Sequence, residues 1–180
     1  MKHNIAVLIS GNGSNLQAII DKGIKVSFVA SNNFRALGLK VAKNANIPTY
    51  SWDSVSDLED EVLKLIIKHD IKLLVLAGYM RLLSKKFVRT LPPKFIINLH
   101  PSLLPNHKGM SAIKQAIDNC AEHTGVTIHY VDEGLDSGSI IKQDSIKIND
   151  TDTIESLKIR LQAIEHRLYP EIIQSILIKS

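Results

Sequence analysis

The sequence has one cysteine and no long apolar run, and both shortages narrow the class of protein. With Cys120 alone among 180 residues, no disulfide can form within the chain, which favours a reducing compartment. The longest apolar run, LLVLAGYM, falls far short of the roughly 20 residues that a membrane span needs. The N-terminal apolar stretch passes directly into the polar loop GNGSN, unlike a secretory signal, so we expect a cytoplasmic protein.

Clustered charge is also missing. The net charge of +4 comes from 22 Lys and Arg against 18 Asp and Glu, with no basic block along the chain. We therefore expect neither a nucleic-acid nor a membrane partner, whereas a small anionic ligand is compatible with the charge. The sequence contains neither CxxC nor HExxH, so we expect no metal.

Short apolar runs alternate with amphipathic segments along the whole chain. The runs predict strands over 4–10, 25–31, 47–52, 71–78, 95–100, 124–131 and 140–148. The segments predict helices over 16–21, 35–45, 55–69, 83–91 and 110–120, and a long helix after residue 152. This order predicts a single Rossmann-like α/β domain, with a mostly parallel sheet, helices on both faces and antiparallel strands toward the C-terminus. In such folds ligands bind beyond the carboxyl ends of the strands.

The last helix has recognisable start and interruption signals. Asp152 and Glu155 have the spacing of a capping box. Pro170 is expected to kink or interrupt the helix, because proline lacks the backbone N–H. One apolar face is predicted from Ile154, Leu157, Leu161, Ile164 and Leu168.

A glycine-containing loop follows the first predicted strand. Its residues are Gly11, Asn12, Gly13, Ser14 and Asn15. Glycines allow close approach to a ligand, and the N–H groups at a helix start suit a phosphate. The loop is neither G-x-G-x-x-G nor a Walker loop, which favours one phosphate over a dinucleotide. The alternative is a plain strand-to-helix turn with polar caps.

The stretch FIINLHPSLLP places polar side chains at the end of an apolar strand. Because side chains alternate along a strand, Asn98 and His100 lie on one face, and Pro101 keeps the next residues extended. An amide beside an imidazolium suits an oxyanion that develops on an attacked carbonyl. The alternative is a strand-end cap, with both side chains bonded to nearby backbone.

Two further segments complete the candidate chemistry. The loop after residue 131 carries Asp132 and Asp136, and either could orient His100, or both could belong to a solvated acidic turn. The segment 75–84 could wall a flat aromatic ligand, although ordinary core packing explains it as well. We assign His129 a structural role, because it lies inside a predicted strand.

Four segments, in this order and spacing, resemble the phosphoribosylglycinamide formyltransferases, a formyltetrahydrofolate-dependent family also called glycinamide ribonucleotide transformylases. They are VLISGNGSNLQAII, LVLAGYMRLLS, INLHPSLLP and LDSGSII, and the resemblance continues to IEHRLYP in the last helix. The resemblance implies transfer of a formyl group from the co-substrate 10-formyltetrahydrofolate to the amine of N1-(5-phospho-D-ribosyl)glycinamide, in purine biosynthesis. It implies small-molecule substrates and a monomer or homodimer.

The resemblance also implies roles for individual residues. Asn98, His100 and Asp136 would be catalytic, with Asp136 assisting proton transfer. The loop over 11–15 would bind the substrate phosphate, and Gln162 and Glu165 the rest of that substrate. The folate would contact Leu76, Met80, Arg81, Leu82, Leu83, Val88, Val131, Asp132, Glu133 and Gly134. One formyltransferase domain over 1–180 is expected, with a phosphate-binding part over about 1–95 and a catalytic and folate part over about 96–180.

The alternatives are a formyltetrahydrofolate hydrolase and a non-catalytic phosphate-binding module of the same fold. A hydrolase of this group usually carries a regulatory domain ahead of the first strand, and here the first strand begins at about residue 4. A non-catalytic module would have no use for Asn98, His100 and Asp136 converging on one point. One departure from the family pattern is Val55, which stands where an arginine usually contacts the substrate.

Overall fold

A computed structural model describes residues 4–179 of the chain. The strands are β1 (Asn4–Ile9), β2 (Val26–Ser31), β3 (Thr49–Ser51), β4 (Ile71–Leu76), β5 (Ile96–His100), β6 (His123–Tyr130) and β7 (Ile140–Lys147). The helices are α1 (Ser14–Asp21), α2 (Leu37–Asn44), α3 (Val55–Lys68), α4 (Lys85–Thr90), α5 (Ala112–Asp118) and α6 (Ile154–Lys179). Each expected strand and helix is present, with ends that differ by a few residues.

All seven strands form one sheet in the order β3-β2-β1-β4-β5-β6-β7. β1 to β5 are parallel, β6 runs antiparallel to β5, and β7 runs antiparallel to β6. The predicted α/β fold with antiparallel strands near the C-terminus is therefore confirmed. Because β1 and β4 are central neighbours, the loops that follow them lie side by side at the carboxyl edge.

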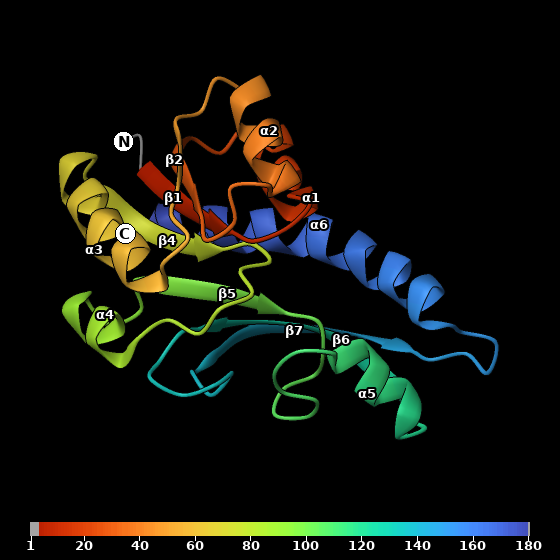
Figure 1. Cartoon of the computed structure of the whole chain (residues 1–180). Helices are drawn as coiled ribbons and strands as arrows, with labels where there is room; N and C mark the ends of the chain where they lie inside the picture. The colour runs from red at the N-terminus through yellow and green to blue at the C-terminus, as the bar shows by residue number, and fades with distance from the viewer. Residues whose placement is uncertain (1–3, 180) are drawn as a thin grey trace.

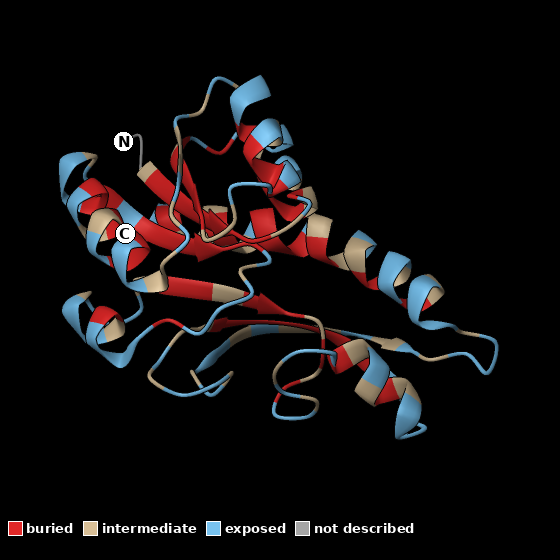
Figure 2. Cartoon of the chain, in the orientation of Figure 1, coloured by how far each residue is buried: buried red, intermediate tan, exposed pale blue. Residues whose placement is uncertain are grey.

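Helices cover both faces of the sheet (Figure 1). Residues of α1, α2 and α6 pack on one face, and residues of α3 and α4 pack on the other. β1 shows why the sequence supports this: Val7 and Ile9 enter the first core, while Ala6 and Leu8 enter the second. The central strands are consequently buried on both sides, whereas the outer helical surfaces are exposed (Figure 2).

The start of α6 differs from the predicted capping box by one residue. The Thr153 hydroxyl accepts from the Ser156 N–H at 3.2 Å, and the Ser156 hydroxyl accepts from the Thr153 N–H at 2.9 Å. Asp152 instead accepts from the Asn149 N–H and the Ser156 hydroxyl. The reciprocal cap therefore joins Thr153 to Ser156, so the predicted Asp152–Glu155 pairing is wrong.

Pro170 does not interrupt α6, which continues for nine residues beyond it. Pro170 is buried, and its neighbours Tyr169 and Ile173 belong to the core on this face of the sheet, which holds the helix in place on both sides of the proline. The predicted apolar face is buried at Leu157, Leu161 and Leu168, but Ile154 is 38% exposed at the first turn. Within the described residues, no helix has both the length and the apolar character for crossing a membrane.

Candidate active site

β5 places Asn98 and His100 as its alternation predicts. Ile97 and Leu99 belong to the core beneath α6, whereas Ile96 packs on the α3 and α4 side. Asn98 and His100 share the face of Ile96 and lie at the carboxyl end of the strand. Two polar groups therefore stand together where ligands of such sheets bind.

Both ring nitrogens of His100 face oxygen atoms. Nε2 lies 2.8 Å from the backbone carbonyl oxygen of His107, and Nδ1 lies 3.5 Å from Oδ2 of Asp136. A carbonyl oxygen only accepts, so Nε2 carries a hydrogen in this arrangement. The His100 side chain is 7% exposed, and that of Asp136 is 10% exposed. The pair is thus well shielded from water, which strengthens its electrostatic interaction.

The structure brings Asp136, and not Asp132, to His100. Asp136 has a positive φ of 47°, and its Oδ2 accepts from the Gly109 N–H at 2.8 Å. Asp132 turns into its own loop, where Oδ1 accepts from the Gly134 N–H and the Ser137 hydroxyl. Asp136 is therefore the carboxylate placed to orient the imidazole.

His129 lies at this site as well, which the sequence did not indicate. It is opposite Asn98 in the β5–β6 register, and the Asn98 Nδ2 lies 3.1 Å from its Nε2. Its Nδ1 donates to the Tyr130 carbonyl at 2.8 Å, so Nε2 holds a lone pair that accepts from Asn98. Burial lowers the pKa of His129, despite the nearby Asp136. A neutral His129 therefore fixes the orientation of the Asn98 amide.

The loop over 11–15 forms a tight turn into α1. Gly13 is the N-cap with a φ of 81°, and the Gly38 N–H donates to the Gly11 carbonyl at 3.0 Å. A Cβ on Gly13 would lie 2.5 Å from Cα of Gly38, so the loop and α2 touch backbone to backbone. The first turn of α1, which includes Ser14, follows the carboxyl end of β1, and the N–H groups at such a helix start suit an anion.

Asn15 differs from its neighbours in the loop, because its side chain turns inward. Its Nδ2 donates to Oε2 of Glu165 at 2.8 Å, and its Oδ1 is buried without a hydrogen-bond partner. Glu165 is 8% exposed, and burial raises the pKa of its carboxyl. Gln162 lies one helical turn earlier on α6 and is half-buried. The structure therefore joins the predicted phosphate loop to the predicted substrate residues of α6.

The predicted folate residues fall into two groups. Leu76, Leu83, Val88 and Val131 belong to or pack against the core on the α3 and α4 side. Met80 and Leu82 are 60% and 64% exposed, Arg81, Asp132 and Gly134 are also exposed, and the Glu133 side chain is 38% exposed. The Met80 N–H donates to the Ser10 hydroxyl at 2.7 Å, which ties this turn to the end of β1. An apolar floor with exposed apolar side chains beside it suits a flat ligand.

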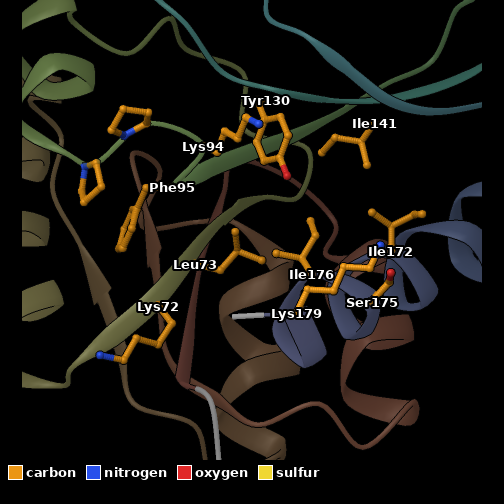
Figure 3. A pocket seen from close by; sticks show the side chains of 12 residues that line it. Lys72, Leu73, Lys94, Phe95, Tyr130, Ile141, Ile172, Ser175, Ile176 and Lys179 are labelled. Carbon is orange, nitrogen blue, oxygen red and sulfur yellow. The ribbon is translucent and has the colours of Figure 1, made fainter.

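A separate hollow of about 430 Å³ lies at the opposite, amino edge of β4 and β5. Figure 3 shows Lys94 and Tyr130 on one side of it and Ile172 and Ile176 of α6 on the other. None of the predicted site residues lines this hollow. Among residues 4–179, no cluster of three or more potential metal ligands occurs.

Comparisons with known proteins show which family the chain resembles along most of its length. The sequence profile of the formyl transferase family matches residues 3–173. Phosphoribosylglycinamide formyltransferase of Bacillus subtilis (strain 168) is 36% identical over 183 residues, covering 96% of this chain and 93% of that protein. The Escherichia coli (strain K12) protein of the same name is 40% identical, covering 94% and 85%.

Longer proteins and solved structures also match. The chain spans 13% of the trifunctional purine biosynthetic protein adenosine-3 of Chironomus tentans, with 38% identity. Glycinamide ribonucleotide transformylase 1 from Geobacillus kaustophilus superposes with a TM-score of 0.92 at 35% identity, covering 98% of this chain and all of that one. The predicted resemblance is confirmed: the chain belongs to the formyl transferase family.

Proposed function

We propose that the chain transfers the formyl group of 10-formyltetrahydrofolate to the amine of N1-(5-phospho-D-ribosyl)glycinamide, a step of purine biosynthesis. The observation that carries this proposal is the convergence of Asn98, His100 and Asp136 at the sheet edge that also holds the loop over 11–15. Family membership and the names of relatives that match along most of their length support the same reaction.

The chemical step is an attack of the glycinamide nitrogen on the formyl carbon. A C–N bond forms, and the carbonyl electron pair moves onto oxygen to give a tetrahedral intermediate. Asn98 donates one amide hydrogen to His129, which leaves its second amide hydrogen for the developing oxyanion. His100 would exchange its contact with the His107 carbonyl for this oxygen when substrate binds.

Collapse of the intermediate breaks the bond between the formyl carbon and the folate nitrogen. The attacking amine loses one proton and the leaving nitrogen gains one, so the step is balanced without an added reagent. Asp136 lies beside His100 and can move this proton, directly or through a water molecule. In this mechanism Asp136 and His100 together act as the general base and the general acid.

The remaining residues would hold the two substrates. Backbone N–H groups at the start of α1 would bind the phosphate, and Gln162 and Glu165 would contact the ribosyl glycinamide portion. The floor of Leu76, Leu83 and Val88 would receive the pterin of the folate. This places the amine donor toward α1 and α6, and the formyl donor toward α4.

The proposal predicts severe loss of activity in His100→Ala and Asp136→Asn. Losing an oxyanion donor or a proton-transfer group lowers kcat by about 10²- to 10⁴-fold. The measurement is formyl transfer between the two named substrates, with circular dichroism to verify folding. His123→Ala is the matched control, because His123 is exposed at the start of β6 and should leave the rate unchanged. Near-normal turnover in His100→Ala would refute the mechanism.

A further inference from the structure

An exposed ion pair joins α4 to the loop between β6 and β7. Nε and Nη2 of Arg89 lie 2.6 Å from Oε1 and Oε2 of Glu133, respectively, although the residues are 44 positions apart in sequence. Such a two-point contact between a guanidinium and a carboxylate fixes orientation as well as distance. The hydrogen bond from Arg89 lowers the pKa of Glu133, which keeps the carboxylate charged.

The segment that receives this contact is compact. Asp132 accepts hydrogen bonds from Gly134 and Ser137, which closes the turn around Glu133. A Cβ on Gly134 would lie 2.1 Å from the Ser137 hydroxyl oxygen, so little space remains inside the turn. Because the turn is compact, a displacement of Glu133 would also move the residues that follow it.

Asp136 lies three residues beyond Glu133 in the same turn. Its other anchor is the Gly109 N–H, which belongs to a different loop. Its distances to the His100 Nδ1 and the His129 Nε2 are 3.5 and 3.7 Å. A rotation of the turn would move the Asp136 carboxylate and change these distances, and the left-handed backbone of Asp136 has few other conformations that could compensate.

The ion pair also borders a hollow of about 480 Å³ between α4 and this turn, which adjoins the amino-edge hollow and shares residues 92–95 and Tyr130 with it. Its lining includes Val88, Val131, Asp132 and Glu133, all of which are predicted folate contacts, together with Arg89. In Figure 1 the turn between β6 and β7 lies next to α4. Arg89 thus connects the helix and the turn that would face each other across the folate.

We propose that Arg89 is a positioning residue that holds the turn over 131–137 in the conformation needed for formyl-folate binding. This inference rests on the proposed function, because the folate is the ligand that the turn would contact. Glu133 would act as the receiver of this contact, and not as a direct ligand of the folate.

The first test measures the turn itself, without any substrate. In Arg89→Ala, amide hydrogen exchange over 131–137 should accelerate, while exchange in the central strands stays unchanged. The double variant Arg89→Glu with Glu133→Arg should restore slow exchange, because it recreates the opposite charges. Unchanged exchange in Arg89→Ala would overturn the proposal, whether or not the protein is a formyltransferase.

The second test separates binding of the two substrates. Arg89→Ala should raise the KM for 10-formyltetrahydrofolate by about two- to fivefold, the effect of one exposed ion pair, with the KM for the amine substrate unchanged. Arg89→Lys keeps the charge but loses the two-point geometry, so its KM for 10-formyltetrahydrofolate should lie between those of the wild type and Arg89→Ala. Salt should raise the wild-type KM more than that of Arg89→Ala, because only the wild type has this ion pair to screen.

Lys64→Ala is the matched control, since Lys64 forms an equally short and exposed ion pair with Glu61 inside α3. It should change neither hydrogen exchange over 131–137 nor either KM. A wild-type protein that transfers formyl groups, combined with an unaltered folate KM in Arg89→Ala, would refute the positioning role alone. A wild-type protein without formyl transfer would refute the proposed function, and the exchange experiment would still decide the role of Arg89 in holding the turn.

Discussion

At the scale of the residue, Glu165 is a carboxyl group held mostly away from water. Its contact with the Asn15 amide favours the charged form, but burial dominates and raises the pKa of Glu165 above the usual 4.5. Its contact with Asn15 joins it to the predicted phosphate loop, so its charge would affect substrate binding under the proposed function. Because burial raises the pKa of Glu165 in the folded protein, the free energy of unfolding should depend on pH through this group.

The variant Glu165→Gln tests this dependence. Between pH 4.5 and the higher folded-state pKa, the folded protein binds more protons than the unfolded chain, so stability falls as pH rises. This loss of stability is complete above the folded-state pKa of Glu165 and absent well below pH 4.5. Glutamine keeps an acceptor for Asn15 but cannot ionise, so Glu165→Gln should gain stability relative to wild type as pH rises, by about 1.4 kcal/mol per pKa unit.

Urea unfolding at several pH values from 4 to 8 measures this difference. A constant difference in the free energy of unfolding between the two proteins would show that the Glu165 pKa is not raised by folding.

Single residues also show what the sequence could and could not predict. The alternation of β5 correctly placed Asn98 and His100 on one face, because that rule is local. It could not reveal His129, since the contact with Asn98 depends on the register between β5 and β6. The same limit applies to Asn15, whose side chain meets Glu165 from 150 positions away.

At the scale of the element, the turn into α1 depends on two glycines from different segments. Gly13 has a left-handed backbone, and Gly38 lies close enough that neither position has room for a side chain. The conformation of the predicted phosphate loop therefore depends on α2 as well as on its own sequence. The contribution of this packing to the free energy of unfolding can be measured separately from the strain of a left-handed backbone.

Gly13→Ala should lower the free energy of unfolding by about 2 to 4 kcal/mol, from left-handed strain plus the clash with Gly38. Gly23→Ala is the control, because Gly23 has a similar φ of 76° but no atom within 4 Å of the added Cβ. It should cost about 1 kcal/mol, from the backbone term alone. Equal losses in the two variants, measured by chemical denaturation, would show that the close approach to Gly38 has no energetic role.

The elements themselves were largely predictable, and their ends were less so. Strong apolar periodicity located α3 and α6, but competition among neighbouring polar residues decided the α6 cap in favour of Thr153 and Ser156. Pro170 shows that burial can retain a helix through a proline that local rules expect to break it. Local propensity is a weak guide where tertiary packing is strong.

At the scale of the whole molecule, one sheet edge gathers every part of the proposed reaction. The ends of β1, β4 and β5 would supply the predicted phosphate loop, the folate wall, and Asn98 with His100, and the β6–β7 turn would supply Asp136. The alternation of strands and helices predicted this edge. The strand order and the ion pair that joins Arg89 of α4 to Glu133 arise from contacts between distant segments, which the sequence pattern does not show.

The most direct test of the account is a substrate-dependence measurement on the wild-type chain. With 10-formyltetrahydrofolate and glycinamide ribonucleotide together, we predict formation of the N-formyl product and tetrahydrofolate in equal amounts. With the folate alone, we predict no consumption, since the amine is the nucleophile. Release of formate without the amine would identify a hydrolase, and no consumption under either condition would identify a non-catalytic binding module; each result would contradict the proposed transfer.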